Sequence, residues 1–149
     1  MEKVEDDINI NECNMHELLP ALFRLQSQRS LTYQRLYDAQ AMFLNTHNFP
    51  GFQVFLSDIT IIFARISEEI LLIKKRFENN KNILKHIEQL QDYEEKKLQL
   101  TNDMFVAKIE KKNEQFQDIN EKSIKLIDDI NEILDELRYD QQDLNSMET

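Results

Sequence analysis

The sequence predicts an all-α protein, with an antiparallel helical hairpin followed by a long coiled-coil helix. Two features of the composition indicate this class. The chain of 149 residues contains one glycine and two prolines, too few for the many tight turns of a sheet protein. Hydrophobic residues make up 41% of the chain and charged residues 31%, a mixture typical of long helices with coiled-coil character. The length fits a single domain.

The beginning of the chain is acidic, and we expect residues 1–13 to form a flexible tail. The first helix begins between Asn14 and Pro20. Asn14 with Glu17 three residues later resembles a capping box, whereas a proline is better placed in the first turn of a helix than in its interior. These two signals differ by one turn, so the start of the helix remains open.

The hairpin is predicted over residues 14–78. Leu19 to Phe43 and Phe52 to Phe77 each contain residues that recur at steps of three and four, the spacing of one helix face. The face of the first helix is only half apolar. We expect a polar network that sets the register of the hairpin, with an exposed recognition patch as the alternative. Its candidate residues are Gln26, Arg29, Tyr33, Thr60 and Ser67.

The stretch HNFPGF contains the only glycine and one of the two prolines, and we expect the turn at 46–51. A proline biases the preceding residue away from helix, and a glycine accepts the positive φ of a tight turn. Aromatic rings flank this turn and are expected to fold inward and close the end of the hairpin. The residues of the turn and its closure are Phe43, Phe49, Pro50, Gly51, Phe52 and Phe55.

Residues 79–144 are predicted to form the long coiled-coil helix, and 145–149 a disordered tail. Helical spacing continues after the asparagine-rich stretch 78–82 and changes phase near 90–98. A break or fold-back near 79–82 or 90–98 remains open. The expected apolar seam consists of Leu98, Phe105, Ile109, Phe116, Ile119, Leu126, Ile130, Ile133 and Leu137.

Polar residues interrupt this seam at Asn102, Lys112, Ser123 and Asp140, and such residues can fix register. A single rod cannot bury its own seam. It must contact a second copy, another protein, or itself after a fold-back. We therefore expect a protein partner or a homo-oligomer through this segment.

No motif for catalysis is present, and we expect neither an enzyme nor a bound cofactor, metal or small-molecule substrate. The single glycine excludes a phosphate-binding loop. Cys13 is the only cysteine, so no second cysteine is present to complete a zinc site. The net charge of −10 disfavours direct nucleic-acid binding, because phosphate contacts require a basic face.

The same features indicate where the protein is located. No run of 18 apolar residues exists, so no transmembrane helix or membrane attachment is expected. The N-terminus lacks the apolar core of a signal peptide, and one cysteine fits a reducing compartment. The expected location is the nucleus or the cytoplasm.

Residues 22–71 resemble the Required-for-excision family, B type, a family associated with DNA repair. The matching features are the pair Leu25-Gln26, the pair Gln28-Arg29, and further residues along the hairpin: Tyr33, Phe43-Leu44, Phe49-Pro50, Phe52, Thr60, Phe63 and Ser67. The stretches 86–101 and 130–142 also look like the later helical part of the family. The resemblance implies a small helical protein connected with excision repair of damaged DNA, and it implies no reaction.

Together these observations favour a non-enzymatic adaptor that acts in excision repair through protein–protein contacts. The alternative is a structural coiled-coil subunit of a cytoskeletal or ciliary assembly.

Overall fold

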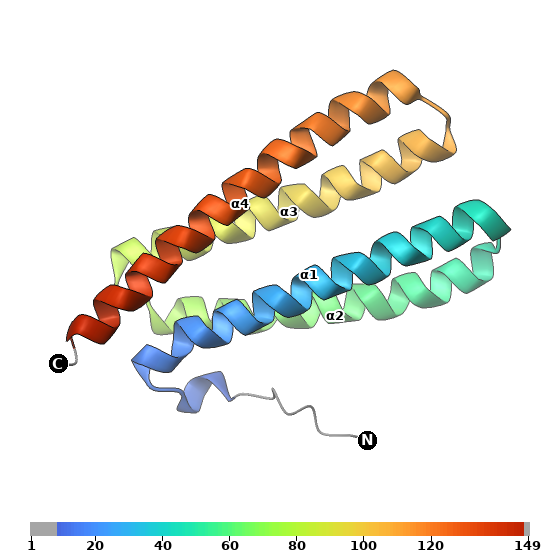
Figure 1. Cartoon of the computed structure of the whole chain (residues 1–149). Coiled ribbons are helices and arrows are strands. Elements are labelled where there is room, and N and C mark those ends of the chain that lie inside the picture. Colours follow the sequence, from blue (N-terminus) through green and yellow to red (C-terminus); the bar gives the residue numbers. More distant parts are fainter. Residues whose placement is uncertain (1–8, 148–149) are drawn as a thin grey trace.

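The computed structural model describes residues 9–147, and within this range the regular structure is entirely helical, without strands. A short 3₁₀ helix, η1 (Ile10–Glu12), precedes four α-helices: α1 (Met15–Thr46), α2 (Phe49–Arg76), α3 (Lys81–Ile109) and α4 (Asn113–Met147) (Figure 1). The predicted all-α class is confirmed.

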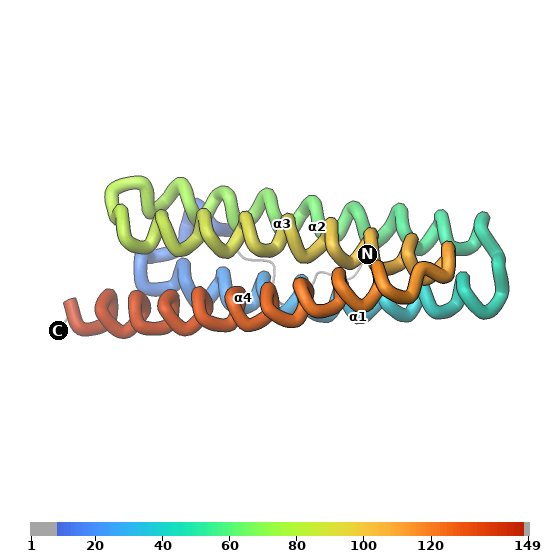
Figure 2. The backbone as a smooth tube through the Cα atoms, turned by 90° about the horizontal axis from the view of Figure 1, so that it is seen from above, coloured from blue at the N-terminus to red at the C-terminus, as the bar shows by residue number. Residues whose placement is uncertain are grey.

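The four helices form two antiparallel hairpins that lie one on the other. α1 pairs with α2, and α3 pairs with α4 (Figure 1). The second hairpin stacks on the first so that α4 lies over α1 and α3 over α2 (Figure 2). Consecutive helices are therefore neighbours, as in an up-and-down four-helix bundle.

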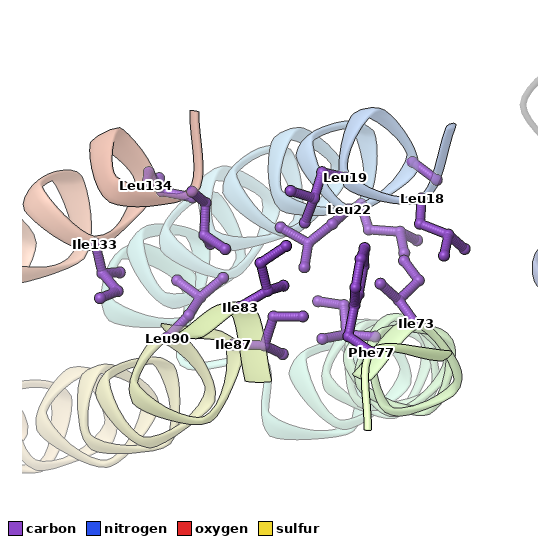
Figure 3. Packing of buried hydrophobic residues seen from close by; sticks show 14 of the residues in the cluster. Leu18, Leu19, Leu22, Ile73, Phe77, Ile83, Ile87, Leu90, Ile133 and Leu134 are labelled. Atoms are coloured by element: carbon purple, nitrogen blue, oxygen red, sulfur yellow. The ribbon is translucent and has the colours of Figure 1, made fainter. Parts of the chain in front are cut away.

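The hydrophobic core has two parts along the bundle. The larger cluster fills the end where α1 begins and α4 ends, and Figure 3 shows leucines, isoleucines and Phe77 from all four helices meeting there. A smaller cluster around Tyr33, Leu36, Ala39 and Ile59 lies toward the opposite end. Gln26, Arg29 and Glu94 lie in the sequence between residues of the larger cluster and residues of the smaller one. Their side chains are buried, and they form the site described below.

The capping box places the start of α1 at Met15, which settles the open question. The Glu17 carboxylate accepts the N–H of Asn14 at 3.1 Å. Pro20 therefore lies inside the helix. Because proline has no N–H, it cannot bond the carbonyl four residues earlier. That carbonyl, on His16, accepts the side-chain amide of Gln141 from α4 at 3.0 Å.

Two segments expected to be flexible are ordered where the structure describes them. Ile10 and Cys13 are buried in the larger cluster. Arg76 at the end of α2 donates to the carbonyls of Ile10 at 2.7 Å and Cys13 at 2.8 Å. Apolar burial and these two bonds explain why residues 9–13 do not form a tail. At the other end α4 continues to Met147. The remainder of the two predicted tails, 1–8 and 148–149, lies outside the described residues.

The hairpin turn uses its glycine differently from our expectation. The residue with positive φ is His47 (φ 55°), and Gly51 lies in the first turn of α2. The N–H of Gly51 donates to the Asn48 side chain at 3.1 Å, which caps α2. A Cβ atom on Gly51 would lie 2.8 Å from Asn48 Nδ2. The glycine therefore leaves room for the capping side chain rather than supplying a left-handed conformation.

The continuous helix expected over 79–144 is wrong, because the segment is interrupted at 110–112. Of the two breaks left open, the one near 79–82 is present as a turn at 77–80, and 90–98 lies within the continuous α3. α2 ends before a turn at 77–80, where the Asn80 side chain accepts the N–H of Ile83 at 3.2 Å and caps α3. A second interruption at 110–112 separates α3 from α4, at a place where the sequence contains neither glycine nor proline.

The interruption at 110–112 is a Schellman motif. The N–H of Lys112 bonds the Ala107 carbonyl at 2.9 Å, and the N–H of Lys111 bonds that of Lys108 at 3.2 Å. Lys111 has a φ of 58°, at the position where glycine is usual. Backbone hydrogen bonds therefore stabilise this turn, although its residues include none of the glycine or proline that usually indicates a turn in a sequence.

Replacing Lys111 by glycine should raise the free energy of unfolding by up to about 1 kcal/mol. A left-handed conformation costs a non-glycine residue about 1–2 kcal/mol, and the greater freedom of glycine in the unfolded chain offsets part of this gain. Urea denaturation measures the change, and Lys112→Gly is the control that should show no gain. A lower midpoint for Lys111→Gly would contradict the proposed role of this turn.

The fold-back covers much of the predicted seam within the chain itself. Ile119, Leu126, Ile130, Ile133 and Leu137 are buried, and the pairing of α3 with α4 is the most extensive in the bundle. Leu98, Phe105 and Phe116 are half-buried, and Ile109 is exposed. The buried part of the seam therefore needs no second chain to cover it. Across residues 9–147, no helix combines the length and the apolar character needed to cross a membrane.

Candidate functional site: a buried polar layer between α1 and α3

A layer of polar side chains crosses the bundle between its two hydrophobic clusters. Gln26 and Arg29 come from α1, and Gln91 and Glu94 come from α3. Steps of three and four place Gln26 and Arg29 on the face of α1 that also carries Leu22. Glu94 follows Leu90 at the same kind of spacing on α3. The helical period therefore brings these polar residues into the core together with their apolar neighbours.

The four side chains form one connected hydrogen-bonded network. Arg29 donates to Gln26 at 3.0 Å and to Gln91 at 2.8 Å. Gln26 in turn donates to Glu94 Oε1 at 2.7 Å. The positive charge of Arg29 and the negative charge of Glu94 are thus linked through the amide of Gln26. Arg29 and Glu94 are only 3% and 5% exposed, so the pair is almost fully removed from water.

Aromatic side chains border this network on the side of the smaller cluster. The Tyr33 hydroxyl donates to the backbone carbonyl of Glu94 at 3.4 Å. Its ring contacts Phe63 edge-on, with centroids 4.9 Å apart. The ammonium group of Lys97 lies 4.0 Å from the centre of the Tyr33 ring, a cation–π contact.

Burial controls the ionisation of the groups in this layer. It lowers the pKa of Arg29 below its usual value, and the Glu94 carboxylate opposes this effect. Burial also lowers the pKa of Lys97, again against the influence of Glu94. For Tyr33, burial and the negative charge of Glu94 both act in the same direction and raise the pKa well above the ordinary value. Glu94 therefore influences every group in the layer whose pKa is shifted.

Replacing Tyr33 by phenylalanine should reduce the rate at which the free energy of unfolding falls as the pH rises in the alkaline range. The pKa of Tyr33 is raised in the folded chain, so its stabilising contribution is fully present below the unfolded value of about 10 and is lost as the pH rises through the folded value. Above pH about 10, wild type should lose up to about 1.4 kcal/mol per pH unit more than the variant. Urea denaturation over this range tests it, with Tyr139→Phe, an exposed ring, as control. Equal slopes for wild type and Tyr33→Phe would contradict the expectation.

A cavity of about 290 Å³ lies beside the network, between α1, α2 and α3. Its walls include Tyr33 and Phe63, the hydroxyl-bearing Ser67, and the carboxylates of α3. One oxygen of the buried Glu94 carboxylate, Oε2, has no hydrogen-bond partner. Buried polar atoms are usually paired, so this oxygen is an acceptor without a donor.

The structure brings together only part of the polar network expected from the sequence. Gln26, Arg29 and Tyr33 meet, but their partners come from α3 and not from α2. Ser67 borders the cavity without a bond to them among the interactions described above. Thr60 is exposed and bonds the Leu56 carbonyl of its own helix at 2.7 Å.

The aromatic group at the hairpin turn is assembled with one additional member. Phe43 lies 6.2 Å from Phe49 and 5.2 Å from Phe52, measured between ring centroids. Phe105 of α3 contacts both Phe43 and Phe52, at 5.9 and 5.4 Å. Phe55 is 45% exposed, Phe49 remains 53% exposed despite its contact with Phe43, and Pro50 is exposed, so the expected inward folding is only partial. The aromatic closure therefore joins the first hairpin to the second.

Sequence reasoning missed Gln91 and Glu94, although a signal for Glu94 exists. Ile83, Ile87 and Leu90 follow heptad steps, and the next step of four reaches Glu94.

A second polar contact was partly indicated by the sequence, because Asp140 interrupts the seam of α4. Its carboxylate is buried and lies 2.6 Å from His86 Nδ1 and 2.9 Å from the Asn82 amide.

The fold and the site define a class of protein: a small up-and-down helical bundle whose core contains a buried ion pair bridged by an amide. The chain belongs to the DNA repair REX1-B family, whose model matches residues 17–108. The matched range contains the whole polar layer and its cavity, whereas α4 lies beyond it. This confirms the resemblance seen over residues 22–71 and 86–101, whereas the stretch 130–142 lies beyond the match. The family name suggests a role related to DNA repair. No curated protein and no solved structure matches the chain.

Proposed function

We propose that this chain is a non-enzymatic helical adaptor, and that it acts in excision repair of damaged DNA through contacts with other proteins in the nucleus. The family membership supports the connection with repair. The net charge of −10 supports protein contacts over direct contacts with a nucleic-acid backbone.

The observation that carries the adaptor role is an apolar stripe on the outer face of α2. Val54, Ile61 and Leu72 are 64%, 65% and 42% exposed. They are separated by about two and three helical turns, which places them on one side of the helix. This stripe lies on the side of α2 away from the buried Ile59 and Ile66.

Charged side chains lie between the apolar members of the stripe. Asp58, Arg65 and Glu68 occupy intervening positions of the same side and are exposed. Apolar anchors with charges of both signs between them suit an amphipathic helix of a partner protein, which binds through regularly spaced apolar residues. The alternative role as a coiled-coil subunit relied on an uncovered seam, and no specific observation favours it.

Affinity purification from cells with damaged DNA tests this function. Full-length tagged chain should enrich excision-repair proteins, and the double variant Val54→Asp with Ile61→Asp should lose them. Both substitutions are at exposed positions, so the fold should persist, which circular dichroism verifies. Ile124→Asp, at an exposed isoleucine of α4, is the matched control and should retain the partners. Recovery of no repair protein with wild type, or equal recovery with the double variant, would count against the proposal.

A further inference from the structure

A second cavity lies between α1, α3 and α4, at the end of the bundle where the two hairpins diverge (Figure 1). Its volume is about 240 Å³, compared with about 150 Å³ for an engineered cavity that binds benzene in another protein. Leu44, Phe105 and Phe116 line it, and each of them is only half-buried. One aromatic side chain of another molecule therefore fits among these apolar walls.

The wall of this cavity contains a buried amide without a partner. Gln40 of α1 is 9% exposed and lines the cavity. Within residues 9–147 its side chain forms no hydrogen bond. The unpaired side-chain atoms that are fully occluded in this range are Glu94 Oε2 and Gln141 Oε1. The Gln40 amide is not one of these sealed groups, so it remains accessible from the cavity that it lines.

Neighbouring polar groups do not supply the missing partner. Gln40 continues the helix face of Arg29 and Tyr33, whose partners come from α3. In this cavity α3 presents Thr101, and the Thr101 hydroxyl donates to the Lys97 carbonyl of its own helix at 2.8 Å. Buried amides are usually hydrogen-bonded, and leaving one unpaired is costly. A ligand that bonds the Gln40 amide would therefore gain affinity.

The charge beside the cavity is positive. Lys108 of α3 is the charged residue among the described lining residues; it is exposed and has no ion pair within residues 9–147. The turn that follows contains Lys111 and Lys112, and Lys112 pairs with Glu110 at 2.8 Å. Segment 108–112 thus carries three lysines against one glutamate, although the whole chain has a net charge of −10. An acidic group of a ligand would be attracted to this end of the bundle.

We propose that this cavity receives a tyrosine side chain of a protein partner, with an acidic residue next to it in the partner. The tyrosine ring would lie among the apolar walls, and its hydroxyl would donate to Gln40 Oε1. Tyrosine suits the site because its hydroxyl both donates and accepts, as an amide requires, and because a buried tyrosine needs such a partner. The acidic neighbour would pair with Lys108. The inference rests on the proposed adaptor function, and it names the side chain by which a partner is recognised.

Titration of the full-length chain with the dipeptide N-acetyl-aspartyl-tyrosinamide tests the cavity directly. The backbone amide resonances of Ala41, Leu44 and Met104 should shift and saturate at millimolar concentration. The corresponding phenylalanine dipeptide should bind about three- to tenfold more weakly, because it cannot bond Gln40. No saturable shift, or equal affinity for the two dipeptides, would overturn the proposal. Tighter binding of adenosine monophosphate would assign the cavity to nucleotides and would overturn it as well.

The variant Gln40→Leu assigns the preference for tyrosine to the buried amide. It should bind the phenylalanine dipeptide at least as tightly as the tyrosine dipeptide. Leucine replaces an unpaired amide by an apolar group of similar size, so the fold should persist. Gln34→Leu, at an exposed position of the same helix, is the matched control and should keep the preference of wild type. A retained preference for tyrosine in folded Gln40→Leu would contradict the site.

Two further variants test the cavity and its charge if Gln40→Leu does not fold. Ala41 borders the cavity and is exposed, so Ala41→Trp would place a ring at its mouth and should abolish binding of both dipeptides. Ala64→Trp, at an exposed position of α2, should not. Lys108→Gln should weaken both dipeptides equally, because it removes the charge and leaves the Gln40 amide. Unchanged binding in folded Ala41→Trp, or in Lys108→Gln, would contradict the proposal.

The outcome is separable from that of the proposed function. Repair proteins that co-purify with wild type and with Ala41→Trp alike, combined with no binding of either dipeptide, would remove this site and leave the adaptor function in place. A preference for the tyrosine dipeptide, without any repair protein in the purification, would support the site and reject the function.

Discussion

Replacing Phe77 by alanine should lower the free energy of unfolding by about 3–5 kcal/mol, the usual cost of removing a buried aromatic ring. Phe77 is 1% exposed and lies in the larger core cluster, where residues of all four helices meet (Figure 3). It follows the last residue of α2 directly, so its ring also fills the space beside the turn into α3. A cavity here would weaken both hairpins at once.

Urea denaturation followed by circular dichroism measures this effect. Small domains are stable by about 5–15 kcal/mol, so this loss is a large fraction of the total and should lower the urea midpoint clearly. Phe55→Ala is the matched control, because it removes the same kind of ring from an exposed position of α2, and it should change stability by less than about 0.5 kcal/mol. Similar midpoints for the two variants would show that the larger cluster is not the main source of stability.

Replacing Arg29 by methionine should also cost about 3–5 kcal/mol, for an electrostatic reason. The variant leaves the Glu94 carboxylate buried without its compensating cation, and it breaks the bonds to Gln26 and Gln91. Methionine retains much of the length of the side chain, so little of the loss should come from a void. Arg35→Met, at an exposed position of the same helix, is the control and should be nearly neutral.

A double-mutant cycle separates the charge effect from the packing effect. Glu94→Leu alone should also destabilise the chain, because it leaves Arg29 uncompensated. The double variant should be more stable than either single variant, since an apolar pair replaces a buried ion pair with little loss. Additive losses in the double variant would mean that the two charges do not interact through Gln26, contrary to the structure.

The helices themselves could be predicted because their signals are local. The face of α1 from Leu19 to Phe43 and the seam from Phe52 to Phe77 follow the helical period, and both segments are helical. The stop at Lys111 could not be predicted, because it depends on a left-handed backbone at a residue that normally avoids it. Its bonds come from backbone groups, which every sequence supplies.

The residues that α1 contributes to the site were predicted from the sequence, and the residues that α3 contributes were missed. Gln26, Arg29 and Tyr33 are conspicuous because polar residues on a core-facing helix side require partners. The partners expected from the sequence were Thr60 and Ser67 on α2, the neighbour in the hairpin. The fold-back of α4 completes a four-helix bundle, in which α3 reaches the same layer of the core and supplies Gln91 and Glu94. The partner of a helix face thus depends on how distant segments pack, and the local period does not contain that information.

The proline inside α1 has a consequence for the sliding of α4 along α1. Pro20 has no N–H to donate to the His16 carbonyl, and the side chain of Gln141, 125 positions later in the chain, donates to it. A shift of α4 by one helical turn, about 5.4 Å, would break this bond. A local feature of the first helix therefore helps to fix the axial register of the last helix.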